Sequence, residues 1–187
     1  MNATATRARS TARGHTGAQR RPAVSIRPIE ASDADDLAAF YAALTDESRR
    51  TRFFCSSRGI SMDQARAFAA VDHRTADGFV AVLRTAGRDD GRIVGHICLE
   101  PNGDRTDEVA VAVADAVQGQ GIGTRLMRAA VTSAAVRGLS GVTASLLCGN
   151  VPMRRLLMAA GLPIVPAGHD GAVASFVLPV STATPVR

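Results

Sequence analysis

Six short stretches, rich in β-branched and other apolar residues and often alternating with polar ones, predict β-strands. They span residues 24–29, 78–85, 92–99, 108–113, 141–147 and 172–178. The polar, glycine-containing stretch 86–91 is expected to join the second and third strands in a hairpin. A Pro-Asn-Gly-Asp turn at 101–104 leads into the fourth strand.

Between these strands, apolar residues recur at the spacing of helices with one buried face. The first expected helix carries its apolar stripe from Leu37 to Leu44, with Ser32 as its N-cap. Gly138 and Gly161 have the place of glycines that follow a helix end. Further helices are expected over 47–54, 61–71, 122–138 and 152–160.

The order of these elements predicts the fold class. A strand and its helices are followed by a three-strand antiparallel run, and then by a helix, a strand, a helix and a last strand. We therefore expect an α/β fold with a mixed, mostly antiparallel central sheet and helices on both faces. The pattern shows no internal repeat, so a single domain is expected over residues 23–180.

A glycine-rich segment lies where the fourth strand passes into the 122–138 helix. Its sequence is Gln118-Gly119-Gln120-Gly121-Ile122-Gly123-Thr124. Glycines at alternate positions remove the Cβ atoms that would keep a ligand away from the backbone. Free amides at the helix start, together with the positive end of the helix dipole, favour a bound phosphate.

A dinucleotide-binding fingerprint does not fit this segment. The third glycine of G-x-G-x-x-G would fall at Thr124, and the acid expected about 20 positions later is absent around Val142 and Thr143. The chain contains no lysine, which also excludes a Walker A loop and a pyridoxal enzyme. Glycines that only make a tight turn from strand to helix are the alternative to a phosphate site.

The pattern Gln118-x-x-Gly121-x-Gly123 resembles the Q/R-x-x-G-x-G/A motif of the GNAT family of N-acetyltransferases, in the place where that family has it. Downstream, Asn150-x-x-Met153, followed by Gly-Leu at 161–162, resembles the second signature of the family. In the amino-terminal half, Ile-Arg-Pro-Ile at 26–29, Thr-Asp-Glu-Ser at 45–48 and Arg-Phe-Phe at 52–54 are similar to bacterial Pat-type protein lysine acetyltransferases. The likeness spans roughly residues 24–178.

The resemblance implies a GNAT-like acyl-CoA N-acyltransferase fold with acetyl-CoA as co-substrate. The pantetheine arm would lie along the strand at 108–113, and the pyrophosphate on amides of the glycine-rich segment. A backbone amide near Val113 would stabilise the oxyanion, and Arg154 or Arg155 is a candidate partner for the 3′-phosphate. The implied coenzyme-binding residues are Val111, Val113, Gln118, Gly119, Gln120, Gly121, Ile122, Gly123, Thr124 and Asn150.

Glu108 is the expected catalytic base, because Pat-type enzymes carry a glutamate at this place. A lysine ammonium with a pKa near 10.4 is about 99.9% protonated at neutral pH, so transfer requires removal of a proton. A solvated strand-end carboxylate is the alternative role for Glu108, and Glu100 is the second candidate base. His96 is expected to be a core histidine. Leu157 stands where the family has its general-acid tyrosine, and Tyr41, the one tyrosine, is far away in sequence.

We expect direct transfer to a primary amine within a ternary complex, with a protein lysine as the favoured acceptor. A small amine, such as an antibiotic, a polyamine or an amino acid, is the alternative acceptor. A non-catalytic acetyl-CoA sensor is the alternative from another class. No nucleic-acid or membrane partner is expected, and the question of a homodimer stays open.

The excess of basic residues in this chain lies at its amino terminus. Five arginines and no acid lie within residues 1–22, although the net charge of the whole chain is only +5. Outside this segment basic and acidic residues balance, so the basicity belongs to a tail rather than to a nucleic-acid-binding surface. We expect residues 1–22 to be a disordered tail, with a transit peptide as the alternative, and residues 181–187 to be a flexible C-terminus.

Three cysteines and four histidines are scattered without metal-ligand spacing, so no metal site is expected. Buried free thiols are expected for Cys55, Cys98 and Cys148. No apolar run reaches the roughly 20 residues that a membrane helix needs. Together these features predict a cytoplasmic enzyme.

Overall fold

The computed structural model describes residues 23–56, 58–85, 88–103 and 105–180. Seven strands form one sheet in the order β1-β2-β3-β4-β5-β7-β6. Neighbouring strands are antiparallel, except that β4 and β5 are parallel. The mixed, mostly antiparallel sheet expected from the sequence is confirmed. The expected tail at 1–22 and C-terminus at 181–187 lie outside the described residues.

The elements follow one another with short connections. The strands are β1 (Val24–Pro28), β2 (Asp77–Thr85), β3 (Arg88–Pro101), β4 (Thr106–Val113), β5 (Gly141–Leu147), β6 (Val165–Asp170) and β7 (Val173–Pro179). The α-helices are α1 (Ala34–Ala43), α2 (Asp46–Phe53), α3 (Met62–Ala69), α4 (Ile122–Val136) and α5 (Val151–Ala159), and two 3₁₀ turns are η1 (Ala31–Asp33) and η2 (Asp115–Val117).

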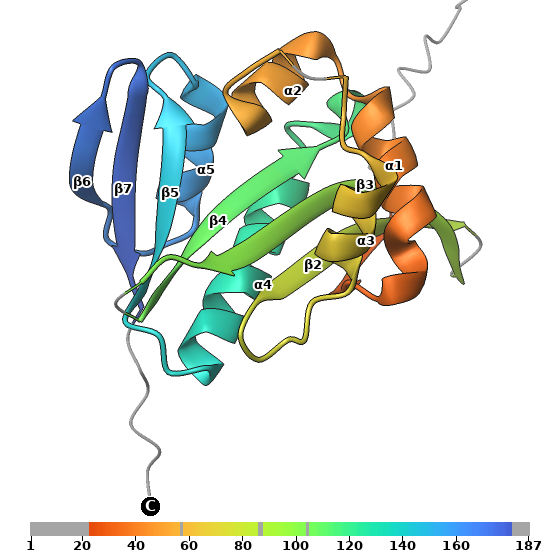
Figure 1. The fold of residues 1–187 in the computed structure, drawn as a ribbon, viewed down its shortest axis with the longest axis horizontal. Helices are drawn as coiled ribbons and strands as arrows, with labels where there is room; N and C mark the ends of the chain where they lie inside the picture. Colours follow the sequence, from red (N-terminus) through yellow and green to blue (C-terminus); the bar gives the residue numbers. More distant parts are fainter. Residues whose placement is uncertain (1–22, 57, 86–87, 104, 181–187) are drawn as a thin grey trace, which may run out of the picture.

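Helices cover both faces of the sheet, as expected (Figure 1). Helices α4 and α5 lie behind it in this view, and α1 and α3 lie in front of β2 and β3. The apolar stripe of α4, including Leu126 and Met127, packs in one core, and Leu37 and Tyr41 of α1 pack in the other. In the described parts of the chain, no helix is both long and apolar enough to span a bilayer.

The first helix begins later than its sequence pattern indicates. Ser32 was expected to be the N-cap, but it lies inside η1, and α1 begins at Ala34. Glu30 and Asp33 form a capping box at this turn instead, each side chain accepting from the backbone of the other. The expectation for Ser32 is therefore wrong, because Glu30 and Asp33 on either side of it supply the cap.

Two further differences concern strands. The expected 86–91 connection is shorter, because β3 begins at Arg88 and pairs with Thr85 of β2. The strand β6 was missed altogether, since Pro166 and Gly168 are typical of a loop and all six of its residues are exposed. It forms the outer edge of the sheet beside β7, where a proline does not interrupt a ladder on both sides.

An ion pair at the start of the fold gives the stability a defined pH dependence. Arg27 donates two hydrogen bonds of 2.7 Å to the buried carboxylate of Asp33, which also accepts from the amide of Glu30 at 2.8 Å. Burial alone would raise the pKa of Asp33, but the bonds from Arg27 and Glu30 outweigh it and hold the pKa below its ordinary value. The stabilisation is therefore present above about pH 4 and is lost as the pH falls through the lowered pKa.

We expect Asp33→Asn to lower the free energy of unfolding by about 1–3 kcal/mol at pH 7, because Arg27 and the amide of Glu30 then face a weaker acceptor. Urea denaturation at pH 7 and at pH 3 measures the effect. The deficit relative to the wild type should shrink at pH 3, and an equal deficit at both pH values would contradict this assignment. Asp63→Asn is the control, because the carboxylate of Asp63 is exposed and its pair with Arg66 contributes little.

Candidate active site

Strands β4 and β5 pair only at their beginnings. Their parallel register runs from Thr106 opposite Gly141 to Glu108 opposite Thr143. Strand β4 nevertheless stays paired with β3 as far as Val113. Beyond Glu108, one edge of β4 is therefore left without a neighbouring strand, and the sheet opens at this point.

The backbone groups on this open edge can be assigned from the pairing of β4 with β3. The amide of Ala114 donates to the carbonyl of Val94 at 2.9 Å. Because amides alternate in direction along an antiparallel strand, those of Val109, Val111 and Val113 point away from β3. The open edge thus offers backbone donors and acceptors to an extended ligand, and Val111 and Val113 lie where the sequence analysis placed the pantetheine arm.

The glycine-rich segment begins α4 with open space in front of it. Gly119 and Gly121 have left-handed φ angles of 71° and 84°, and a Cβ atom on either would meet nothing within 4 Å. The first hydrogen bond of the helix runs from the amide of Arg125 to the carbonyl of Gly121. The amides of residues 122–124 therefore precede the helical ladder and are available to an anion at the helix N-terminus.

The third glycine of the segment has a different role. A Cβ atom on Gly123 would come within 3.2 Å of Cδ1 of Leu156. Gly123 therefore permits the close approach of α4 to α5. Asn150 caps α5, since its side chain accepts from the amide of Met153 at 3.0 Å, so this motif residue also shapes the local fold.

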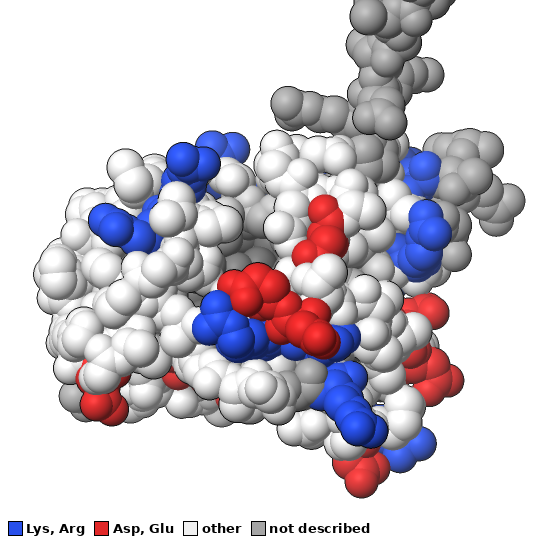
Figure 2. All heavy atoms as spheres, turned by 90° about the horizontal axis from the view of Figure 1, so that it is seen from above, with Lys and Arg blue, Asp and Glu red and all other residues white. Residues whose placement is uncertain are grey.

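One cavity of about 1230 Å³ brings these parts together. It is lined by the open edge of β4, the glycine-rich segment, the end of β5, the start of α5 and the helices α2 and α3. In Figure 2 the surface is hollowed between two lobes, and acidic and basic side chains are mixed around the hollow. The lining includes the predicted residues Glu108, Val111, Val113, Gln118, Gly119, Gly121, Ile122, Gly123, Thr124 and Asn150.

These observations fit a coenzyme A ester. A phosphate would meet free amides at the start of α4, and an amide-containing arm would meet the open edge of β4. Such a ligand needs glycine where the chain has Gly119 and Gly121, because side chains there would extend into the cavity. The alternative of a purely structural turn explains neither the open space nor the unpaired edge.

The comparison with known proteins decides the family. Residues 37–162, more than half of the chain, match the model of the Acetyltransferase (GNAT) family. The chain belongs to the GNAT family. As a GNAT N-acetyltransferase it is an enzyme, and the resemblance derived from its two motifs is confirmed.

Solved GNAT structures have the same fold. The GNAT domain of S. lividans PAT is 27% identical, with 83% of this chain and 90% of that chain covered and a TM-score of 0.74. A phosphinothricin acetyltransferase from Sinorhizobium meliloti in complex with AcCoA is 16% identical, with 88% and 92% covered and a TM-score of 0.66. Spermidine N-acetyltransferase from Vibrio cholerae in complex with CoA and spermine is 18% identical, with 85% and 96% covered and a TM-score of 0.64. At these last two identities the likeness shows the fold alone.

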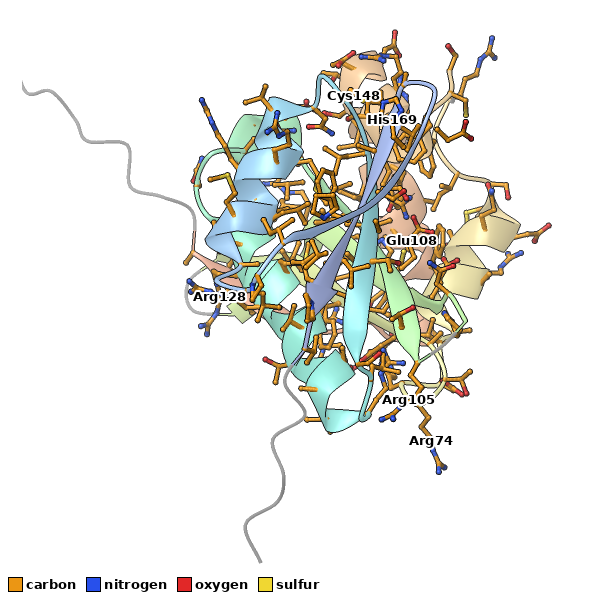
Figure 3. The ribbon with its side chains drawn as sticks, turned by 90° about the vertical axis from the view of Figure 1, so that its left-hand side faces the viewer. Arg74, Arg105, Glu108, Arg128, Cys148 and His169 are labelled. Carbon is orange, nitrogen blue, oxygen red and sulfur yellow. The ribbon has the colours of Figure 1, made fainter. Side chains whose placement is uncertain are left out.

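In this GNAT chain two glutamates lie at opposite positions on neighbouring strands, beside the opening of the sheet. Glu108 on β4 pairs directly with Glu100 on β3, and both line the cavity. Glu108 is half-buried, whereas Glu100 is exposed. Figure 3 shows Glu108 on the sheet well away from Cys148 and His169, which lie together near the end of β5. Glu108 therefore lies in a part of the cavity away from Cys148, which also lines it.

A guanidinium group enters the same part of the cavity from α2. Arg52 donates to Sγ of Cys98 at 3.3 Å and lies 5.0 Å from the ring centre of Phe53. Burial, only partly offset by Arg52, raises the pKa of the Cys98 thiol. Cys98 is thus a neutral thiol close to Arg52 and Glu100, and it is a poor nucleophile.

The tyrosine and histidine in the core do not take part in the chemistry of the cavity. The hydroxyl of Tyr41 is hydrogen-bonded to Nδ1 of His96 at 2.9 Å, and both side chains are fully buried. Burial raises the pKa of Tyr41 to about 12 and, with the nearby Arg52, lowers the pKa of His96 to about 3. His96 is therefore neutral, as expected of a core histidine, although its Nε2 has no hydrogen-bond partner among the described residues.

The side chains of the two glutamines in the motif, Gln118 and Gln120, are not free to contact a coenzyme in the way expected from the sequence. The amide of Gln118 donates to the carbonyl of Asp115, and its side chain donates to the carbonyl of Val113 at 3.0 Å. Its polar groups are thus engaged by the protein, so that free phosphate donors begin at Gly119. Gln120 does not line the cavity, and its side-chain oxygen is buried without a partner in the described part of the chain.

The structure also tests the expected burial of the cysteines and the expected place of the two arginines on α5. Cys98 is buried as expected, but Cys55 and Cys148 are exposed, which corrects the prediction for those two. Of the two arginines on α5, Arg155 lines the cavity. Within the described residues, no group of three metal-ligating side chains lies close together.

Sequence patterns missed Arg52, Ser48 and Asp115, which also shape this site. Each acts through a partner far away along the chain, Arg52 through Cys98 and Ser48 through Asp115, which the local sequence does not indicate. The available signal was the resemblance to Pat-type enzymes, which includes Ser48 in the 45–48 segment and Arg52 in the 52–54 segment.

Proposed function

We propose that this enzyme transfers the acetyl group of acetyl-CoA directly to the side-chain amine of a protein lysine. One observation carries the proposal: Glu108 lies in the same cavity as the phosphate-binding segment, at the point where β4 leaves β5. Acetyl-CoA supplies the activated acetyl group when it is bound. The chain supplies the amides that hold it and the carboxylate that accepts a proton.

Glu108 accepts the proton of the acceptor ammonium. Its partner across the strands, Glu100, adds a second negative charge on the same face of the sheet. Glu47 and Arg50 at this end of the cavity pair with each other. Glu100 and Glu108 against Arg52 then leave an excess of negative charge, which favours a cationic amine over an anion. The amide of Val113 is the expected donor to the oxyanion, since it points away from β3 on the open edge of β4.

Three features support a protein acceptor. The chain is 27% identical to the GNAT domain of S. lividans PAT over most of its length, and its amino-terminal motifs resemble Pat-type enzymes. The cavity is bordered by exposed residues of α2 and by Ser145 and Leu147 of β5. An acceptor polypeptide would lie along this border, with its lysine side chain directed to Glu108. A small amine is the second candidate acceptor, because similar folds include phosphinothricin and spermidine acetyltransferases.

Release of free thiol from acetyl-CoA distinguishes these acceptors. We expect release with lysine-containing peptides and little release with polyamines, amino acids or phosphinothricin. Incubation of a lysate with the enzyme and labelled acetyl-CoA, followed by mass spectrometry, should then locate labelled lysines. Release with small amines alone would overturn the protein acceptor. Binding of acetyl-CoA without release in any mixture would favour the non-catalytic sensor.

A further inference from the structure

Helix α2 forms one wall of the acceptor end of the cavity, and only its carboxyl-terminal end contacts the core. Glu47, Arg50 and Arg52 of this helix line the cavity, and none of its eight residues is buried. Arg49 ties the helix to the end of α1 through the carbonyls of Ala42 and Leu44. Phe53, its last residue, packs against Tyr41 and the core at the end of the helix. The rest of this short helix has no buried side chain, so its position depends on such polar ties.

The second tie comes from the coenzyme side of the site. Asp115 in η2 accepts from the amide of Thr45 at 3.1 Å and from its hydroxyl at 2.9 Å, and from the hydroxyl of Ser48 at 2.7 Å. Both carboxylate oxygens are used. Thr45 is the N-cap of α2, since its hydroxyl also accepts from the amide of Ser48 at 3.3 Å. Asp115 therefore binds the α2 N-terminus, where a negative charge is favourable.

The same cluster continues into the glycine-rich segment. The side-chain amide of Gln118 donates to the carbonyl of Val113 at 3.0 Å and lies 3.3 Å from the Ser48 hydroxyl and 3.4 Å from Asp115. We call these four side chains (Thr45, Ser48, Asp115 and Gln118) the α2 latch. The latch joins residues about 70 positions apart in the sequence. It connects the acceptor wall to the segment whose amides face the coenzyme phosphates.

The charge of Asp115 is well stabilised in this arrangement. Burial alone would raise the pKa of Asp115, but the hydrogen bonds from Ser48 and Thr45 outweigh it, and the pKa is held below its ordinary value. The carboxylate is therefore ionised at neutral pH, when it can accept from all three donors at once. Asparagine has the same shape but offers one accepting oxygen instead of two.

We propose that Asp115 is a positioning residue that couples coenzyme binding to the placement of α2. Acetyl-CoA on the amides of residues 119–124 restrains the segment that carries Gln118 and, through the latch, holds the acceptor wall in place. This inference rests on the proposed function, because it assigns α2 to the acceptor. It implies that acceptor binds more tightly after acetyl-CoA and, by reciprocity, that acceptor strengthens the binding of acetyl-CoA.

Hydrogen exchange of residues 45–53, with and without acetyl-CoA, tests the coupling without any acceptor. We expect acetyl-CoA to slow exchange in this segment by about fivefold or more in the wild type, and to have little effect on it in Asp115→Asn. Asp63→Asn, which removes an exposed carboxylate from α3, should behave as the wild type. Equal coenzyme-dependent protection in wild type and Asp115→Asn would overturn the proposal.

Steady-state kinetics supply the second measurement. Asp115→Asn should raise the acceptor KM about five- to tenfold, while kcat and the acetyl-CoA Kd change less than about twofold. Thr45→Ser keeps the hydroxyl and should retain the wild-type acceptor KM. Ser48→Ala removes one donor to Asp115 and should raise the acceptor KM, but less than Asp115→Asn does. The effects of Asp115→Asn and Ser48→Ala should not add in the double variant, because both remove the same contact.

The two hypotheses fail in different ways. If the wild type acetylates no amine, the proposed function fails, and hydrogen exchange still decides whether the latch couples the coenzyme to α2. If the wild type acetylates peptides but Asp115→Asn has an unchanged acceptor KM and unchanged exchange, the function stands and the role of Asp115 is refuted. A fall in kcat with an unchanged KM would also refute it, since that result places Asp115 in the chemical step.

Discussion

Replacement of Glu108 by glutamine is expected to lower kcat by about 10²- to 10⁴-fold at neutral pH, the usual contribution of a general base. The acetyl-CoA Kd should stay nearly unchanged, because the phosphate-binding amides lie at the start of α4, away from this side chain. Glutamine keeps the shape of glutamate and the pairing of β4 with β3. The change therefore removes the proton acceptor without disturbing the opening of the sheet. Stopped assays of thiol release at saturating acetyl-CoA measure kcat.

The pH dependence makes this test specific. Without a base, the rate depends on the fraction of amine that is already neutral, which rises about tenfold per pH unit below the amine pKa near 10.4. The rate of Glu108→Gln should accordingly approach that of the wild type at alkaline pH. Glu100→Gln is the matched control, since it removes a carboxylate from the opposite position on β3 and should cost less than about fivefold. If Glu100→Gln has the larger effect, the roles of the two residues are reversed.

Gly121→Leu should abolish the stabilisation of the protein by acetyl-CoA. In the wild type, a coenzyme concentration 100 times the Kd stabilises the fold by about 2.7 kcal/mol, a rise in Tm of about 5 to 10 °C. A side chain at residue 121 would extend into the open space before the phosphate-binding amides. Thermal scans with and without acetyl-CoA measure the loss.

The glycine Gly138 supplies a control for backbone strain. Its φ of 74° is close to the 84° of Gly121, and a Cβ atom there would also meet nothing within 4 Å. Each leucine therefore costs a similar amount, about 1–2 kcal/mol, but Gly138 lies at the far end of α4, outside the cavity lining. Gly138→Leu should keep the full coenzyme shift. A full shift in Gly121→Leu as well would refute the assignment of this segment. Gly123 is unsuitable for this test, because a side chain there meets Leu156.

Those parts of the site that depend on local sequence could be predicted. A strand, a turn with left-handed glycines and a helix start are all encoded within residues 108–124, so the chemistry of the segment follows from its own residues. The parallel pairing of β4 with β5 follows from the helix between them. Glu108 could be placed at the start of the strand, although only the family resemblance distinguished a catalytic glutamate from a solvated carboxylate.

Features that depend on the contact of distant segments could not be predicted. No pattern indicates that Glu100 lies opposite Glu108, because strand register is set by tertiary packing. The contact of Asp115 with Thr45 spans 70 residues and involves polar side chains that resemble ordinary surface residues. The edge strand β6 lacks the alternation of a half-buried strand, so its residues resemble a loop until β7 is there to pair with them.

The short pairing of β4 with β5 has a consequence for the lifetime of the protein in a cell. Among the described residues, three residue pairs join strands β5, β7 and β6 to the rest of the sheet. A ligand that bridges the opening therefore adds to the contacts that the shared core provides. Opening between the two parts exposes backbone to proteases, and the population of that open state falls as ligand binds. The abundance of this enzyme should therefore follow the supply of its own acetyl donor, with faster turnover when cellular acetyl-CoA is depleted.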